Sequence, residues 1–301
     1  MKTNNFSFLA IGKTQESKEA GEGSFKRYVG LGSSYVLAVN PNKKKLDELR
    51  GFESQNEPEY VKDGDNGKEV HINFVVKTDP NTCNGIEMTN LAMFTLRQRP
   101  AYNRDETKVQ VLDDYGNHTW VNTETAKAGA ALPENLAIDH NKYRMACDGE
   151  CDLIDFLKKY LNVPNSLNYV NGSWFLSDNA AEGEFRLEHV KDFFKGDFKE
   201  LNEALAFQPN NKVKLLYGVR TTDEGKQYQT VCTRGDMILR NNAGVNAIAK
   251  LEKTLTDAKN NGSFPTTEYK VQELQEYVVE PTNLSNAPST SSSDSDMPWD
   301  V

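Results

Sequence analysis

The sequence predicts an α+β fold in which an antiparallel β core is interrupted by a helical insertion and followed by a disordered acidic tail. Three observations support this prediction. Runs of β character lie on both sides of a central segment, about residues 134–208, whose apolar residues recur at helical intervals. The last residues, 281–301, are rich in Pro, Asn, Ser and Asp and contain no Lys or Arg. We therefore expect a folded body at 1–280 and a tail at 281–301.

The first predicted strands lie within FKRYVGLGSSYVLAVN, residues 25–40, as two short runs in which Gly30 and Gly32 suit a bulge or a sharp bend. A Pro-Asn step ends this region, and the following residues, 42–52, have the composition and spacing of a short helix. Residues 53–68 are rich in Asp, Glu, Asn and Gly, and this composition predicts a loop.

Four further strands are predicted before the central segment. In EVHINFVVKT, the apolar Val70, Ile72 and Phe74 alternate with more polar residues, which is the period-2 pattern of a half-buried strand. The step from Asp114 to Asn117 has the composition of a hairpin turn. The predicted strands of this region are 69–78, 88–99, 108–114 and 117–121.

The central segment is predicted to be a helical insertion, because two stretches in it space their apolar residues at helical intervals. These stretches are 151–163 and 182–207, the second with a break at Gly196. Strand character then returns in a predicted hairpin, and a helix and a last strand follow. Their ranges are 212–220 and 227–234 for the hairpin, 244–260 for the helix and 268–280 for the strand.

Strands on both sides of the helices most simply complete one sheet. A partly open, five-stranded Greek-key barrel of the OB type fits this order, since it tolerates a long insertion between strands. We therefore expect an OB-like barrel as the core of the body.

The charge of the chain is unevenly distributed. The 301 residues carry a net charge of −9, and four acidic residues with no Lys or Arg follow residue 279, so the preceding part carries −5. Any surface that binds an anion must therefore be a local groove.

The cysteines and the apolar runs bear on location. Four cysteines without regular spacing fit reduced thiols. No apolar run approaches the roughly 20 residues that span a bilayer, so we expect no membrane partner and a cytoplasmic location.

The common enzyme signatures are missing from this sequence. It contains no GxxxxGK[ST], GxGxxG, HExxH or GxSxG motif, so we expect no catalytic residues and no cofactor. Cys147 and Cys151, with His140 upstream and Cys83 or Cys232 far away in the sequence, give only weak support to a zinc site, because zinc ligands usually come in two compact pairs. We therefore expect no metal.

Aromatic and basic residues recur together on the predicted strands and hairpin loops. Single-stranded nucleic acid requires this mixture, because bases stack on aromatic rings while Lys and Arg contact the phosphates. Any one such cluster is more simply the charged edge of a strand, but their recurrence favours a binding face. The residues predicted to bind are Lys26, Arg27, Tyr28, Arg97, Arg99, Tyr102, Arg104, Trp120, Tyr217, Arg220, Lys226 and Tyr228.

The tail ends in SSSDSDMPWDV, which joins a solvated stretch to an apolar aromatic step. Solubility explains the serines and aspartates but not a tryptophan. An aromatic residue at the end of a flexible acidic tether suits docking, in which the ring enters an apolar pocket and the carboxylates meet basic residues. The residues predicted to bind a partner are Asp294, Asp296, Met297, Pro298, Trp299 and Asp300.

This ending resembles the acidic tails of bacterial and phage single-stranded DNA-binding proteins, which finish with aspartates followed by Pro-Phe or a similar aromatic step. The body is similar to proteins of the crAss-like tailed phages, in the stretches FLAIGKTQESKEAGEGSFKRYVGLGSSYVLAVNPNKK, LLYGVRTTDEGKQYQTV and EYVVEPTN. The resemblance implies single-stranded DNA binding by most of the chain. Asp300 and Val301 follow Trp299 here, whereas the known tails end on the aromatic residue, so the details of docking are not carried over.

The first hypothesis is therefore a non-enzymatic, single-stranded DNA-binding protein of phage replication, recombination or repair, which coats DNA and recruits replication or recombination proteins through its tail. The alternative is a structural or packaged virion protein with a docking tail. A third hypothesis, a nucleic-acid-processing enzyme with Asp113 and Asp114 as metal ligands, is weaker, because adjacent acidic residues before a turn usually serve the turn.

Overall fold

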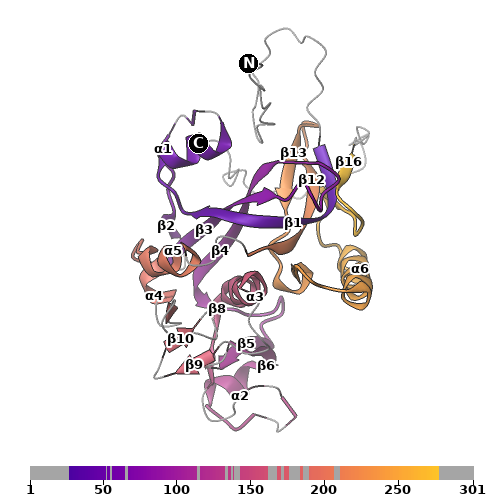
Figure 1. Cartoon of the computed structure of the whole chain (residues 1–301). Coiled ribbons are helices and arrows are strands. Elements are labelled where there is room, and N and C mark those ends of the chain that lie inside the picture. The colour runs from indigo at the N-terminus through magenta and orange to yellow at the C-terminus, as the bar shows by residue number, and fades with distance from the viewer. Residues whose placement is uncertain are drawn as a thin grey trace, which may run out of the picture.

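The computed structural model describes residues 27–51, 53–54, 56–64, 67–113, 116–132, 135–136, 138, 143–161, 168–170, 173–175, 184–185, 190–206 and 211–277. Within these ranges the chain forms a curled antiparallel sheet with helices on its faces (Figure 1). The α+β class with a mainly antiparallel core is thus confirmed. None of the helices in the described ranges is long and apolar enough to cross a membrane.

Six strands form the main path of the large sheet, in the spatial order β13-β12-β1-β3-β4-β8. Their bounds are β1 Arg27–Val39, β3 Gly67–Thr78, β4 Thr89–Pro100, β8 Cys147–Asp148, β12 Val213–Thr221 and β13 Gln227–Val231. Four short strands pair beside this path: β2 Val61–Gly64, β14 Leu239–Arg240, β15 Thr267–Tyr269 and β16 Gln275–Tyr277.

Two small sheets accompany the large one. One contains β5 Lys108–Asp113, β6 His118–Asn122 and β7 Tyr143–Met145, and the other contains β9 Asn168–Val170, β10 Ser173–Phe175 and β11 Glu184–Phe185. The helices are α1 Lys43–Arg50, α2 Thr123–Lys127, α3 Glu150–Tyr160, α4 Val190–Phe193, α5 Lys199–Ala206 and α6 Val245–Asn260, with a 3₁₀ turn, η2, at Gly235–Met237.

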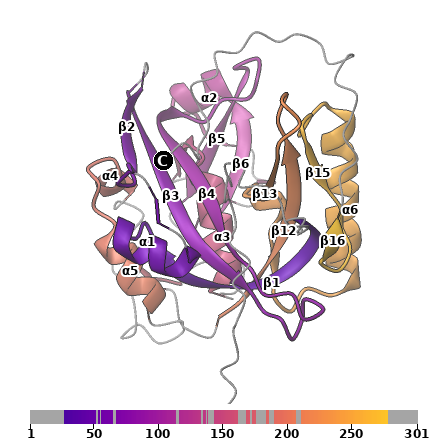
Figure 2. The same cartoon turned by 90° about the horizontal axis from the view of Figure 1, so that it is seen from above.

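The connectivity of the large sheet is that of a Greek key. The strands β1, β3 and β4 are neighbours in space in their order along the chain, and β12 returns after a long connection to pair with the other side of β1. The β1 strand divides its length among three neighbours, since residues 27–29 pair with β16, residues 30–34 pair with β12 and residues 34–39 pair with β3. The sheet then curls enough for β13 to approach β4 (Figure 2).

Glycine and a bulge shape β1 where it changes neighbours. Gly30 has a φ of 132°, and a Cβ at this position would lie 2.6 Å from the carbonyl oxygen of Glu273. A side chain is therefore excluded, and the 270–277 segment can lie directly against the strand. A register shift between Val36 and Ala38 marks a bulge in the pairing with β3. The sequence predicted two short runs here, whereas the structure has one long strand.

Helix α3 covers the concave face of the curled sheet. Its Phe156 ring lies 4.5 Å from the ring of Phe74 on β3 and 5.1 Å from that of Phe94 on β4, centroid to centroid. The helical spacing of 151–163 predicted this apolar face, and Leu153 and Leu157 are indeed buried in the same cluster. The main core of the curled sheet therefore lies between α3 and the strands β3 and β4.

Helix α6 covers the opposite face of β12, as Figures 1 and 2 show. Leu216 of β12 packs with Leu251 and Leu255 of α6, while its neighbour Leu215 belongs to the core beneath α3. The helix predicted at 244–260 is thus confirmed, and β12 is a strand buried on both faces.

Three predictions about the elements are wrong. The segment 134–208 is not only a helical insertion, because β7 pairs with β5, β8 pairs with β4, and β9 to β11 form a sheet of their own. The predicted loop at 53–68 contains β2, which pairs with β3. The predicted strand at 268–280 is instead the two strands β15 and β16, which pair with different neighbours. These strands have two to four residues, too few to show a period.

Candidate nucleic-acid interface

Part of the predicted site lies outside the described residues. These positions are Lys26 and the partner-binding residues Asp294, Asp296, Met297, Pro298, Trp299 and Asp300. The remaining residues of the predicted DNA-binding set fall into a buried pair and three groups on the surface.

Tyr28 and Tyr217 are core residues, which corrects their prediction as stacking residues. Tyr217 has no exposed surface, and its hydroxyl lies 2.6 Å from that of Ser34 in a buried hydrogen bond. Burial raises the pKa of this phenol above its ordinary value. Tyr28 is 7% exposed and belongs to the same cluster. Both rings are occupied by protein neighbours, so no base can stack on them.

The first surface group, here called the β4 arginine cluster, consists of Arg97, Arg99, Glu69, His71 and Asp148. Strand pairing assembles it, because Arg97 lies opposite Glu69 of β3 on one side and opposite Asp148 of β8 on the other. Arg97 Nε lies 2.7 Å from Glu69 Oε2, and Asp148 Oδ2 accepts from Arg99 Nη2 at 3.0 Å and from Arg97 Nη1 at 3.5 Å. His71 Nε2 lies 2.7 Å from Glu69 Oε1.

The β4 arginine cluster is open to solvent at its arginines and less open at its carboxylates. The side chains of Arg97 and Arg99 are 44% and 50% exposed, against 25% for Glu69 and 31% for Asp148. Partial burial works to raise the pKa of Glu69, but the hydrogen bond from His71 and the charge of Arg97 hold that pKa below its ordinary value. Both arginines could therefore turn toward an added anion without leaving a core position.

The second group lies on the β12–β13 hairpin. Arg220 and Tyr228 are directly opposite each other in the register, so they face the same side. Lys226 sits in the exposed turn, with its Nζ 2.8 Å from Glu224 Oε2. Arg27 also lies in this group, but its role is structural, because its Nε and Nη2 donate to the carbonyl oxygen of Gln227 at 3.3 and 3.1 Å.

The third group belongs to the small sheet of β5, β6 and β7. Trp120 on β6 is 43% exposed, which is unusual for so large an apolar side chain. Arg104 is exposed in the turn that leads into β5, where Asn103 N donates to Lys108 O at 3.0 Å. Tyr102 is half-buried against the apolar side of the same sheet. Figure 1 places this sheet at the opposite end of the molecule from the β12–β13 hairpin.

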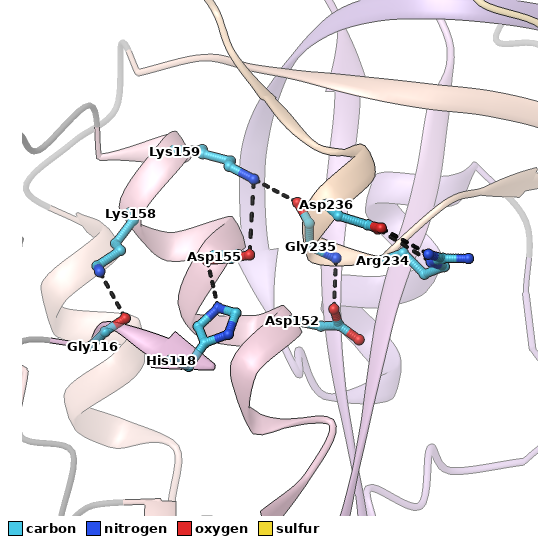
Figure 3. Close-up of polar contacts among 9 residues, drawn as sticks. All are labelled: Gly116, His118, Asp152, Asp155, Lys158, Lys159, Arg234, Gly235 and Asp236. Carbon is cyan, nitrogen blue, oxygen red and sulfur yellow. Dashed lines mark hydrogen bonds and ion pairs between the residues drawn. The ribbon is translucent and has the colours of Figure 1, made fainter. Parts of the chain in front are cut away.

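A polar seam holds the small sheet against α3 (Figure 3). His118 Nε2 of β6 lies 3.1 Å from Asp155 Oδ1, and Lys158 Nζ donates to the carbonyl oxygen of Gly116 at 2.7 Å. The adjacent Lys159 contacts η2 instead, where its Nζ donates to the carbonyl oxygen of Gly235 at 2.5 Å. The contacts of Asp155 and Lys158 fix the strand that carries Trp120, two residues beyond His118.

Two aspartates of α3 in this seam have opposite pKa shifts. Burial alone would raise the pKa of both carboxyl groups. For Asp155 the hydrogen bond from His118 and the charge of Lys159 outweigh the effect of burial, so the pKa of Asp155 lies below its ordinary value. For Asp152 burial dominates, although its Oδ1 accepts from Gly235 N at 2.7 Å, and its pKa is raised. The charge of Asp155 therefore stabilises the fold, whereas that of Asp152 costs stability.

We expect Asp155→Asn to lower the free energy of unfolding at pH 7 by about 1 kcal/mol, because it weakens two charge-assisted contacts. This loss should shrink as the pH falls below the ordinary aspartate value of about 4, where the unfolded chain takes up the proton first, and it should disappear below the lowered pKa of Asp155 in the folded protein. Asp152→Asn is the matched control, and its stability at pH 7 should equal or exceed that of the wild type. Urea unfolding at pH 7 and pH 3.5 measures both, and an equal loss in the two variants would contradict this assignment.

The carboxylates and thiols that the sequence suggested as metal ligands contact other protein groups in the structure. Asp113 is buried, and its carboxylate accepts from the backbone N and the Nδ2 of Asn117 at 2.9 and 3.1 Å, which is turn chemistry. Burial and the nearby Glu150 raise the pKa of the Cys147 thiol. Among the described residues, which do not include His140 or Asp114, no group of three or more His, Cys, Asp or Glu is placed to hold a metal ion.

Sequence reasoning missed three members of the β4 arginine cluster. Glu69 and His71 stand on alternating positions of a predicted strand, so their exposure could be expected, but their pairing with Arg97 depends on the register. Asp148 could not be predicted from the sequence, because its two-residue strand is too short to show a pattern.

No protein-family model, curated protein or solved structure matches the chain.

Proposed function

We propose that this protein binds single-stranded DNA on the surface of an OB-like barrel and that it does not cut or join the strand. In this proposal β1, β3, β4, β12 and β13 are the five strands of the barrel. The order of pairing supports it, since the first three strands are consecutive neighbours, the fourth returns to the first, and the fifth approaches the third.

The placement of the exposed basic residues is the observation that carries the proposal. OB barrels bind nucleic acid on the face of their second and third strands and on the loops between strands 1 and 2 and between strands 4 and 5. Arg97 and Arg99 stand on the third strand, β4, and Lys226 stands in the loop between the fourth and fifth strands. Two stretches that are remote in the sequence thus bring cations to the two expected places.

The chemistry of these groups suits a single strand. Arginine donates two parallel hydrogen bonds to a phosphate, and Arg97 and Arg99 are exposed enough to do so. Tyr228 is half-buried beside Arg220 and offers a face to a base, and Trp120 offers a second, more distant one. Stacking on such rings tolerates any base, so the proposed function is coating rather than sequence recognition.

The resemblance to phage proteins extends this proposal to DNA replication, recombination and repair, with the tail as the part that recruits other proteins.

The direct test of single-stranded DNA binding is a fluorescence-anisotropy titration with labelled oligo(dT) at low salt. Binding that weakens steeply with added salt is expected, because phosphate contacts release counterions from the DNA. Absence of binding to the single strand would contradict the proposed function.

For the tail, deletion of residues 291–301 should tighten binding to oligo(dT), because its carboxylates compete with phosphates for the same cations. It should also abolish the capture of replication or recombination proteins. Anisotropy and pull-down with the full chain and with the deletion variant measure the two effects. The control is Trp299→Ala, which keeps the carboxylates of Asp294, Asp296 and Asp300, and it should reproduce only the loss of capture. If the deletion changes neither property, the proposed role of the tail is wrong.

A further inference from the structure

We propose that Asp148 and Glu69 act as internal substitutes for DNA phosphates, which occupy Arg97 and Arg99 in the free protein and must be displaced when a single strand binds. This inference rests on the proposed function and describes how the same site is regulated. In the β4 arginine cluster, each exposed arginine is paired with a carboxylate that a neighbouring strand supplies.

The geometry places the carboxylate oxygens where phosphate oxygens would bind. Asp148 Oδ2 accepts from both Nε and Nη2 of Arg99, at 3.3 and 3.0 Å, so one oxygen takes the two donors on one edge of the guanidinium. The same oxygen lies 3.5 Å from Arg97 Nη1, so a single anionic atom bridges both arginines. A phosphate oxygen between Arg97 and Arg99 would satisfy the same donors.

The backbone fixes Asp148 in this position more firmly than its own ion pairs do. Asp148 lies opposite Arg97 in the pairing of β8 with β4, and the next residue, Gly149, is the N-cap of α3. Glu150 at the first position of that helix is fully buried, and Arg144 donates to both of its carboxylate oxygens. The chain on the C-terminal side of Asp148 is therefore anchored, and replacing its carboxylate should leave β8 in place.

Exchange of a carboxylate for a phosphate has a thermodynamic signature. A freed Asp148 or Glu69 takes up a cation from solution when DNA displaces it, and this uptake offsets part of the counterion release from the DNA. Removing the carboxylate should then both tighten binding and make it more dependent on salt. A residue that only positions the arginines would have the opposite effect on affinity.

The test compares the wild type with Asp148→Asn, which keeps the size of the side chain and removes its charge. We expect about two- to fivefold tighter binding to oligo(dT), since exposed ion pairs are individually weak, together with a steeper slope of the logarithm of affinity against that of salt concentration. Asp236→Asn is the matched control, because Asp236 also pairs with an exposed arginine, Arg234, at 2.7 Å on η2. It should change affinity much less.

A double-mutant cycle completes the experiment. In a chain that already carries Arg97→Ala and Arg99→Ala, Asp148→Asn should give no more gain than the control does, because the competition needs the arginines. Weaker binding by Asp148→Asn, or a gain no larger than that of Asp236→Asn, overturns this inference while the proposed function stands. If neither the wild type nor Asp148→Asn binds the single strand, both are overturned.

Discussion

Replacing Arg97 and Arg99 together with alanine should weaken the binding of oligo(dT) about tenfold near physiological salt and flatten the salt dependence by about one unit of slope. Each phosphate contact to a single strand contributes roughly 0.7 to that slope, and within the described part of the chain these two arginines are paired with carboxylates of the neighbouring strands β3 and β8. Their loss also removes the arginine partners of Glu69 and Asp148, whose negative charges then repel the strand more strongly.

The control for this variant is Arg234→Ala. Arg234 is a surface arginine with a 40% exposed side chain, paired with Asp236, and it directly precedes η2, beyond the seam with α3 (Figure 3). The Arg234→Ala variant removes one positive charge, against two in the double variant, without touching β4, so it should reduce affinity only slightly. Anisotropy titrations at several salt concentrations measure both variants. An equal loss of binding free energy per removed charge in the two variants would show that only net charge matters and would contradict a site on β4.

The second large effect is expected in the fold itself, from Gly149→Ala. Gly149 has a φ of 82°, and a Cβ at this position would lie 2.0 Å from the carbonyl oxygen of Thr95. The substitution combines left-handed strain with a backbone clash that no side-chain movement relieves, so we expect a loss of about 3 kcal/mol or more. Because Gly149 joins β8 to α3, this loss should be accompanied by displacement of Asp148.

Gly129→Ala separates the two causes. Gly129 also has a positive φ, of 63°, but a Cβ there would meet nothing within 4 Å. Its substitution should cost only the backbone strain, about 1 kcal/mol. Urea unfolding of the two variants measures the difference. If Gly149→Ala were no more destabilising than Gly129→Ala, the tight contact between the start of α3 and β4 would be contradicted.

Elements with a clear period could be predicted from the sequence. The hairpins β5–β6 and β12–β13 and the helices α1, α3 and α6 are at or near their expected positions. The Asp-Tyr-Gly-Asn step and the helical spacing of Leu153 and Leu157 are local signals, and local signals are sufficient for such elements. The strands β7 to β11 have two or three residues each and depend on partners that are distant in the sequence.

The prediction of the site residues was limited for the same reason, because local signals do not show which residues of a strand the distant parts of the chain bury. Tyr217 and Tyr228 both stand beside basic residues in predicted strands, yet one is core and the other is partly exposed. The sequence around Tyr217, KVKLLYGVR, does not alternate, because α3 and α6 bury β12 on both faces. With no alternation, the inward and outward residues of such a strand cannot be separated before the helices are placed.

The carboxylates of the site were hidden for a different reason. Glu69 and Asp148 meet Arg97 across two separate strand pairings, so their roles follow from register. A shift of one residue in either pairing would turn these side chains to the other face of the sheet. The sequence could therefore predict the cations of the β4 arginine cluster but not the anions that hold them.

The measurement that tests the central claim most directly is a titration of the full chain with labelled single-stranded and double-stranded oligonucleotides of equal length, over a range of salt concentrations. We predict tighter binding to the single strand, a logarithmic affinity that falls linearly with the logarithm of salt concentration, and a flatter line for the Arg97→Ala/Arg99→Ala variant. Equal affinity for both oligonucleotides, or the same salt slope with and without these arginines, would contradict the account.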